Sequence, residues 1–221
     1  MTAQILLEYR DIRVDGDDAP IVSGFSASVP AGRLTVMVGP SGAGKTTLLR
    51  LLNRLDDPDG GTVLFAGRDV RAYDVLDLRR RVQLVGQVPV TFPGTVADNL
   101  LLAVPLSDPA APGPAGNGAV AGWLARVGLD GGLAGREADR LSVGEAQRLA
   151  LARSLALSPE VLALDEPTSA LDTASKSGIV TLIRGLADSG LTVVMVTHDP
   201  AHADLADHVV RVEPHTRDRR P

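Results

Sequence analysis

The stretch Gly39-Pro40-Ser41-Gly42-Ala43-Gly44-Lys45-Thr46 decides the fold of this chain, because it matches the pattern G-x-x-x-x-G-K-[ST]. An apolar strand pattern precedes it and a helix pattern follows it. Glycines in this setting let backbone N–H groups turn inward around phosphate oxygens, and the helix N-terminus adds a positive dipole end. The segment Gly39–Thr47 is therefore predicted to bind a nucleoside triphosphate. Lys45 would reach the β- and γ-phosphates, and the Thr46 hydroxyl would hold magnesium.

Two carboxylates, Asp165 and Glu166, stand at the end of a second apolar strand pattern, residues 161–164. A buried parallel strand delivers its C-terminal residues to the crevice where ligands bind. Asp165 is therefore predicted to hold magnesium, and Glu166 suits the general base that orients and deprotonates the attacking water. A strand that ends in Asp-Glu is weak evidence by itself, but beside a phosphate loop it becomes strong.

The rest of the chain alternates between strand and helix patterns, which is typical of a largely parallel sheet with helices on both faces. The expected strands are residues 5–9, 21–29, 34–38, 62–66, 82–85, 161–164, 192–196 and 209–212, and the expected helices are residues 44–55, 75–81, 96–102, 120–127, 142–157 and 174–187. The Ala-, Pro- and Gly-rich segment Pro105–Gly118 is predicted to be a mobile loop, and the polar tail from Pro214 is expected to fray. The length of 221 residues suits one domain, residues 1–221.

The composition excludes several classes of function. A net charge of −5 and a pI near 5.3 argue against a nucleic-acid partner that depends on phosphate neutralisation. Without cysteine the chain can form no disulfide, thiolate zinc site or cysteine nucleophile. No segment reaches the roughly 18 uninterrupted apolar residues that span a bilayer, and residues 1–13 do not resemble a signal peptide. Any membrane role is therefore expected to come through a partner.

A family resemblance rests on motifs spread over nearly the whole chain. The run Leu141-Ser142-Val143-Gly144-Glu145-Ala146-Gln147-Arg148 precedes Asp165-Glu166-Pro167-Thr168-Ser169-Ala170-Leu171-Asp172 at close range. Gln87 follows Lys45 by about forty residues, and His198 follows a late apolar strand pattern. In this order and spacing, the motifs resemble the signature, Walker B motif, D-loop, Q-loop and switch histidine of ATP-binding-cassette (ABC) ATPases.

The resemblance implies a shared active site. In ABC ATPases the signature begins a helix and faces the γ-phosphate bound by the other subunit, so Ser142, Gly144 and Glu145 are expected at the nucleotide of a second copy. Asp172 would run along the dimer seam. Gln87 would sense magnesium and the attacking water, and His198 would contact the γ-phosphate.

The same resemblance implies an α/β P-loop fold in three parts. A nucleotide core carries an antiparallel β-subdomain near the N-terminus, and a small helical subdomain spans residues 88–157. The implied cofactors are ATP and Mg²⁺, and the implied partners are a second copy of the chain and an integral membrane permease, with no nucleic acid. The chain would lie in the cytoplasm, on the inner face of the cell membrane, and catalysis would use Lys45, Gln87, Glu166 and His198.

Two departures from the family pattern stand out. The first glycine of the signature is replaced by Val143, which is tolerable because Ser142 and Gly144 are the expected contact residues. The aromatic residue that family members place before the phosphate loop, stacked on adenine, would fall near Val14, and no aromatic lies between residues 10 and 24. Tyr9 reads as a core or sheet residue. Because aromatic stacking on a base is worth about 1–3 kcal/mol, adenine preference is expected to be weak.

The subfamily depends on less specific features. The segment 82–100, the short chain and the ending 207–215 look like the small ATPases paired with the iron-export (metal-resistance) permease family, whose plant relatives act in aluminium tolerance. Phosphate-import ATPases and the lipoprotein-release or cell-division type are near alternatives.

Three other interpretations remain open at this stage. His198 and His202 are spaced to bind zinc from one helix face. A non-transport ABC ATPase acting on DNA or ribosomes is disfavoured, because the chain lacks zinc cysteines, a coiled-coil insertion and a second cassette. A scaffold that binds ATP without hydrolysing it is disfavoured by the presence of Glu166.

Overall fold

The computed structural model describes residues 4–103 and 117–214. Most of the loop expected at 105–118 and of the tail expected from 214 therefore lies outside the described residues. The end of that expected loop, residues 117–118, instead forms the first turn of a helix, α4 (Asn117–Arg126).

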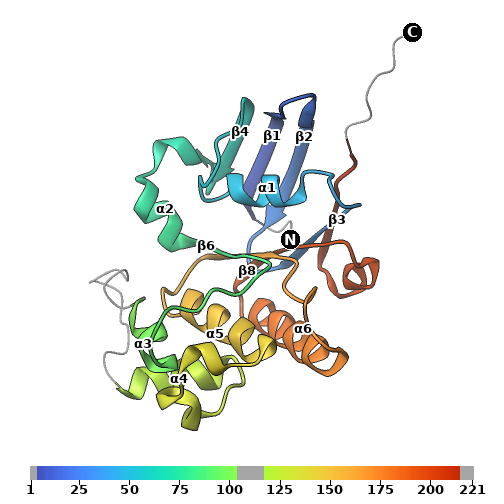
Figure 1. The fold of residues 1–221 in the computed structure, drawn as a ribbon. Helices are drawn as coiled ribbons and strands as arrows, with labels where there is room; N and C mark the ends of the chain where they lie inside the picture. The colour runs from blue at the N-terminus through green and yellow to red at the C-terminus, as the bar shows by residue number, and fades with distance from the viewer. Residues whose placement is uncertain (1–3, 104–116, 215–221) are drawn as a thin grey trace.

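A five-stranded parallel sheet forms the centre of the molecule (Figure 1). Its strand order is β6-β7-β8-β3-β9, and every neighbouring pair is parallel. The strands are β6 (Val82–Val85), β7 (Val161–Asp165), β8 (Thr192–Thr197), β3 (Leu34–Val38) and β9 (His208–Arg211). Every residue of β3, β7 and β8 is buried, which explains why these segments read as continuous apolar runs.

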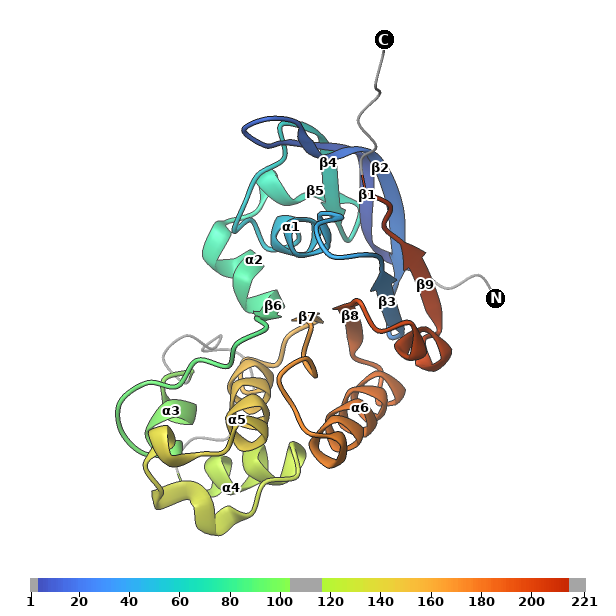
Figure 2. The same ribbon diagram turned by 45° about the vertical axis from the view of Figure 1, so that its right-hand side comes forward.

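The parallel sheet separates two hydrophobic cores. Along β7, Val161 and Ala163 belong to one core, and Leu162 and Leu164 belong to the other, as the two-residue period of a strand requires. The first core lies under α1 (Lys45–Leu51) and an antiparallel sheet, and the second lies under the helices α3–α6, as Figures 1 and 2 show from two sides. The sheet is thus covered on both faces, as predicted.

The antiparallel sheet has the order β2-β1-β4-β5. Its strands are β1 (Ile5–Asp15), β2 (Pro20–Pro30), β4 (Gly60–Phe65) and β5 (Arg68–Asp69). The prediction ended the first strand at Tyr9, six residues too early. The register shifts between Tyr9 and Ile12, and Asp11 lies there at a φ of 48°, so the apolar alternation breaks and then resumes at Ile12 and Val14.

The remaining helices are α2 (Val75–Arg81), α3 (Val96–Leu101), α5 (Val143–Leu155) and α6 (Thr173–Asp188). Within residues 4–103 and 117–214, the chain also forms four 3₁₀ helices that were not expected from the sequence: η1 (Val70–Ala72), η3 (Gly131–Gly135), η4 (Ala138–Arg140) and η5 (Pro200–Leu205). A helix long and apolar enough to cross a membrane is not found in the described part of the chain.

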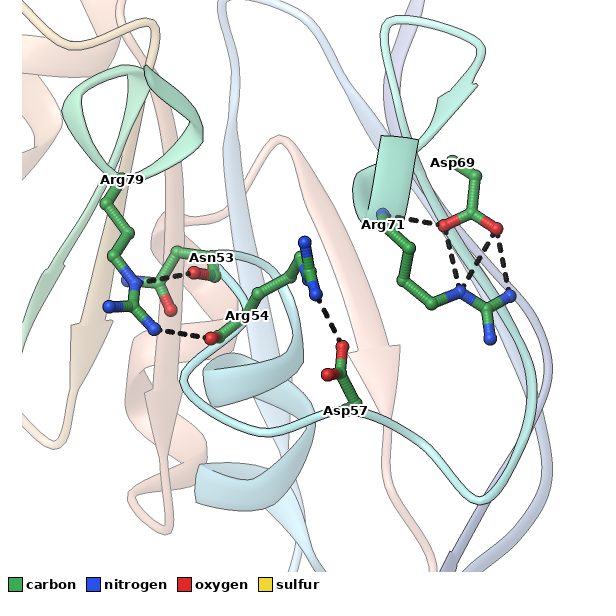
Figure 3. Close-up of polar contacts among 6 residues, drawn as sticks. All are labelled: Asn53, Arg54, Asp57, Asp69, Arg71 and Arg79. Atoms are coloured by element: carbon green, nitrogen blue, oxygen red, sulfur yellow. Dashed lines mark hydrogen bonds and ion pairs between the residues drawn. The ribbon is translucent and has the colours of Figure 1, made fainter. Parts of the chain in front are cut away.

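The helix α1 that follows the phosphate loop ends at Leu51, whereas the sequence pattern extended it to Leu55. The chain turns because Arg54 adopts a φ of 55° and the Leu55 N–H donates to the Arg50 carbonyl, the bonding of a Schellman turn. Figure 3 shows how this end is held: Arg79 of α2 donates to the carbonyls of Asn53 and Arg54, at 3.2 and 2.6 Å. A cation at the C-terminus of a helix also suits the helix dipole.

Candidate functional site

The phosphate loop connects β3 to α1, and its glycines have conformations that other residues avoid. Gly42 and Gly44 have φ angles of 80° and 83°, and a Cβ at Gly44 would overlap the Val22 side chain. Lys45 is buried, and its Nζ donates to the carbonyls of Gly39 and Pro40 at 2.8 and 2.9 Å. The ammonium group is thereby held inside the curve of the loop.

The carboxylate of Asp165 lies directly beside the phosphate loop. The Thr46 hydroxyl donates to Asp165 Oδ1 at 3.0 Å, which joins two residues 119 positions apart in the sequence. Burial raises the pKa of Asp165, and the hydrogen bond from Thr46 acts in the opposite direction. The neighbouring Glu166 carboxylate raises this pKa further.

Glu166 occupies an uncommon backbone position immediately after β7. Its φ is 48°, and its N–H donates to the Val196 carbonyl at 3.0 Å. Its Oε2 pairs with Nδ1 of His198, which follows β8. The side chain of Gln87, which follows β6, donates through Nε2 to Ser169 Oγ at 3.2 Å.

These side chains surround an open cavity of about 390 Å³. It is lined by Ile21, Ser41, Gly42, Gly44, Lys45, Thr46, Thr47, Gln87, Glu166 and His198. The structure thus brings together residues from the phosphate loop and from the ends of three parallel strands, β6, β7 and β8. Three members of the loop do not line this cavity. Gly39 and Pro40 offer their carbonyls to Lys45, and Ala43 is buried in the core and borders a separate hollow between β2 and β9.

The residues at the phosphate end fit magnesium and phosphate. A hydroxyl and a carboxylate are the hard oxygen donors that Mg²⁺ prefers, and Mg²⁺ is usually held by one or two protein groups plus substrate phosphates. The pair Thr46 and Asp165 matches that donor set. A buried lysine supplies the matching cation for phosphate oxygens.

The signature residues do not line this cavity. Ser142 is the N-cap of α5: its hydroxyl accepts from the Glu145 N–H at 3.3 Å, and its own N–H donates to Glu145 Oε2 at 2.8 Å, which together form a capping box. The Ser142 hydroxyl also donates to Glu145 Oε2 at 2.9 Å. The capping bonds lower the pKa of Glu145. Gly144 follows in the first turn of α5. Asp172 caps α6 by accepting from the N–H groups of Ala174 and Ser175, each at 3.0 Å.

The end of the cavity beside Ile21, where the adenine base is expected and which we call the base end, differs from the expectation of an adenine-contacting position near Val14. Val14 is buried in the core opposite Val22, so it cannot face a nucleotide. Tyr9 is also a core residue, as predicted, and its hydroxyl donates to the Leu48 carbonyl at 3.0 Å. Ile21 lines the cavity instead, with 38% of its surface exposed. Ile21 was not among the residues expected at the site, because the β1–β2 pairing and not the distance along the chain brings it beside Gly44.

The alternative zinc site at His198 and His202 is not formed. His202 is buried, and its Nδ1 bonds to the Thr197 hydroxyl at 3.1 Å, while His198 pairs with Glu166. Among the residues that the structure describes, no cluster of three or more His, Asp or Glu side chains could hold a metal.

Comparison with known proteins agrees with this geometry. The protein-family model described as ABC transporter matches residues 22–169. "ABC transporter I family member 17" of Arabidopsis thaliana is 45% identical over 192 residues, which cover 84% of this chain and 70% of the relative. "Phosphate import ATP-binding protein PstB 2" of Mycobacterium tuberculosis is 44% identical over 83% of this chain and 69% of the relative. "Probable iron export ATP-binding protein FetA" of Escherichia coli K12 is 36% identical over 95% of this chain and 92% of the relative.

Solved structures show the same fold. The ATP-binding cassette MJ0796, determined as a dimer in a post-hydrolysis state with ADP and phosphate, superimposes with a TM-score of 0.81 and 25% identity. The match covers 96% of this chain and 97% of that one. Together, the family match and the phosphate-loop geometry show that this chain is an ATP-binding domain of the ABC transporter family, a magnesium-dependent ATPase.

Proposed function

We propose that this chain drives a membrane permease and that two copies close around two MgATP. The observation that carries this proposal is the separation of two residue sets. Lys45, Thr46 and Glu166 gather at one cavity, whereas Ser142 and Asp172 lie outside it and cap helices. A second copy would supply the missing set across the interface, and the solved relative with ADP and phosphate is dimeric.

Within one copy, Lys45 and Thr46 bind and orient the triphosphate. The Lys45 ammonium exchanges its bonds to the loop carbonyls for bonds to phosphate oxygens. Thr46 and Asp165 hold the magnesium ion, which supplies charge neutralisation at the phosphates when bound. The low dielectric around Asp165 strengthens this attraction, because a buried carboxylate without a cation is electrostatically costly.

Glu166 is the proposed general base. Its carboxylate lines the cavity and accepts a proton from the attacking water, and the pairing with His198 fixes where it points. Gln87 follows the neighbouring strand, β6, and helps to position that water. Its bond to Ser169 connects the segment after β6 to the segment after β7.

Ser142 and Gly144 serve the nucleotide of the other copy in this proposal. The start of α5 presents the Ser142 hydroxyl and the N–H groups of the first helical turn, which favour a negative phosphate group. Val143, in place of the usual glycine, is 50% exposed and points its bulk away from the core. It therefore leaves the neighbouring contact residues in place.

The segment after Gln87 is the proposed docking surface for the permease. Val88, Val90 and Phe92 expose 76%, 56% and 44% of their surfaces. Two polar side chains hold this segment: the buried Asn99 accepts from Phe92 N–H at 2.8 Å, and the partly buried Arg153 donates to the Val90 carbonyl at 2.9 Å. An apolar surface on such a fixed backbone suits an amphipathic helix of a partner.

Iron or another metal ion is the proposed cargo, moved outward. The support is the similarity to the iron-export relative, which runs nearly end to end in both chains. Phosphate import is the second candidate, because the phosphate-import relative is more identical over a shorter share of its length. ATPase activity of the chain reconstituted with a permease partner would separate the two: stimulation by Fe²⁺ supports export, and stimulation only by phosphate overturns it.

The substitution Glu166→Gln tests the shared active site. It keeps the size of the side chain and removes the base, so ATP should trap a dimer that elutes early in size-exclusion chromatography while hydrolysis stops. The control is Glu160→Gln on the surface, which should stay active. A Glu166→Gln protein that remains monomeric with ATP and hydrolyses it at the original rate would refute the proposal.

A further inference from the structure

Helices α5 and α6 approach each other closely at two glycines. At Gly144 of α5, a Cβ would stand 3.1 Å from Ser175 Oγ and 3.4 Å from Ser175 Cβ on α6. At Gly178 of α6, a Cβ would overlap the guanidinium of Arg148 on α5. The two contacts lie one helical turn apart on each helix, so they fix both the distance and the sliding of α5 against α6.

Ser175 also bonds to the segment that precedes α6. Its hydroxyl donates to Asp172 Oδ2 at 2.7 Å, while Asp172 Oδ1 accepts from the backbone N–H groups that begin the helix. One serine side chain therefore bonds to Asp172 and also occupies the space beside the signature glycine, Gly144.

Arg148 fixes the other contact. Its Nη1 donates to the Val127 carbonyl at 2.5 Å, just after the end of α4, where a cation suits the helix dipole. The same guanidinium fills the space that Gly178 leaves on α6. Arg148 thereby holds α4, α5 and α6 together below the start of the signature helix.

We infer that Ser175 and Arg148 are positioning residues that join the signature segment and Asp172 into one rigid unit. The inference rests on the proposed dimer, in which both segments act on the nucleotide of the other copy. Dimer closure must order every segment that it uses, and ordering costs conformational entropy. If the signature segment and the Asp172 segment are already fixed to each other, closure pays the entropy cost of ordering them only once. The free energy of dimer closure then becomes more favourable, and the binding of ATP to one copy does not change.

Ser175→Ala in the Glu166→Gln protein is the first test. It removes the hydroxyl that bonds to Asp172 and that lies nearest to Gly144, and it keeps the Cβ of residue 175 in place. We expect ATP-driven dimerisation, measured by sedimentation, to weaken about three- to tenfold, the usual range for one hydrogen bond. The dissociation constant of a fluorescent ATP analogue for the single chain should change less than about twofold, because the residues of the same copy that bind ATP are untouched. Ser177→Ala on the same helix is the matched control, since that exposed hydroxyl bonds only to the Thr173 carbonyl of its own helix.

Gly178→Ala is the second test. The added methyl group displaces Arg148 and should weaken dimerisation more than Ser175→Ala does. Gly185→Ala is its control on the same helix, because a Cβ there meets nothing within 4 Å, and it should dimerise normally. In Arg148→Ala protein, Gly178→Ala should cause little further loss, because the group that it displaces is gone.

The outcomes separate this inference from the proposed function. If the Glu166→Gln parent does not dimerise with ATP, the shared active site itself is refuted, and the inference falls with it. If the parent dimerises and both Ser175→Ala and Gly178→Ala dimerise equally well, only the inference is overturned. Equal losses of dimerisation and of single-chain nucleotide binding would also overturn it, because they would indicate general damage to the fold.

Discussion

The two ends of the nucleotide cavity differ in the chemical groups that line them. At the phosphate end, backbone groups of a glycine loop, a buried lysine and a buried carboxylate converge, and Lys45 and Asp165 are both held by hydrogen bonds. At the base end, the cavity has one large apolar side chain, Ile21, which is partly exposed. The aromatic side chains Tyr9 and Phe25 lie nearby in sequence but pack against each other, with ring centroids 5.3 Å apart.

This difference indicates where the binding energy for the nucleotide comes from. Charge-assisted hydrogen bonds to phosphate are about twice as strong as neutral ones, and they do not depend on which base is attached. Contact with an aliphatic side chain buries apolar surface of the base, but it supplies no hydrogen bonds that could distinguish adenine from guanine. The chain should therefore hold any nucleoside triphosphate mainly by its phosphates.

The largest expected effect comes from removing the lysine at the phosphate end. Lys45→Ala should lower ATPase activity about 10²–10³-fold, the scale seen when a preorganised donor to developing charge is removed. Phosphate release at saturating ATP measures it. Lys176→Ala is the control, because Lys176 is the only other lysine in the sequence and is exposed. Retained turnover in Lys45→Ala would count against the phosphate-loop assignment.

Asp165→Asn should lose activity to a similar or smaller extent but gain stability. The buried carboxylate is costly without a cation, and the amide still accepts the Thr46 hydroxyl. The Tm of the nucleotide-free protein should rise by about 2–4 °C for each kcal/mol of charge burial relieved. Asp18→Asn on the surface should leave both quantities unchanged. A lower Tm for Asp165→Asn would mean that the charge stabilises the empty site.

Changes at Ile21 should be smaller and should affect base selectivity. The dissociation constants of ATP and GTP should differ by less than about threefold in the unaltered protein. Ile21→Tyr should strengthen ATP binding about fivefold, since a stacked aromatic is worth about 1 kcal/mol or more. The same substitution at Ile5, exposed at the start of β1, is the control. Strong ATP selectivity before any substitution would contradict the comparison of the two ends.

The smallest effect concerns His202, which is buried and bonds to the Thr197 hydroxyl at the end of β8. Burial lowers the pKa of His202, and Lys176 and His198 lower it further, against Asp199 and Glu166. The unfolded chain therefore takes up this proton first as the pH falls, and the free energy of unfolding should decrease below about pH 6.5, by up to about 1.4 kcal/mol per pH unit. In His202→Gln the decrease should be shallower. Identical slopes in urea unfolding from pH 5 to 8 would refute it.

Most of the correct predictions came from local sequence motifs. The phosphate loop, the Asp165-Glu166 pair and the strands of the parallel sheet depend on neighbouring residues or on apolar runs, and the structure places them together. Ile21 could not be found in this way, because its position beside Gly44 depends on the register of β1 against β2. That register shifts near Asp11, which no periodic pattern reveals.

The predicted element ends failed where special backbone conformations intervene. Arg54 ends α1 in a left-handed conformation that sequence patterns usually assign to glycine. The tertiary bonds from Arg79 stabilise that turn, and they come from a helix 25 residues further along the chain. Contacts of this kind become visible only in three dimensions.

The positive φ of Glu166 limits which amino acids the position can accept. Only glycine, and to a lesser degree asparagine and aspartate, adopts that conformation readily, and β-branched residues are the most strained. A saturation library scored only for folded protein should therefore be enriched in these three residues and depleted of valine, isoleucine and threonine. In this chain, the backbone conformation at position 166 therefore restricts which residues the folded protein tolerates there, independently of any requirement for catalysis.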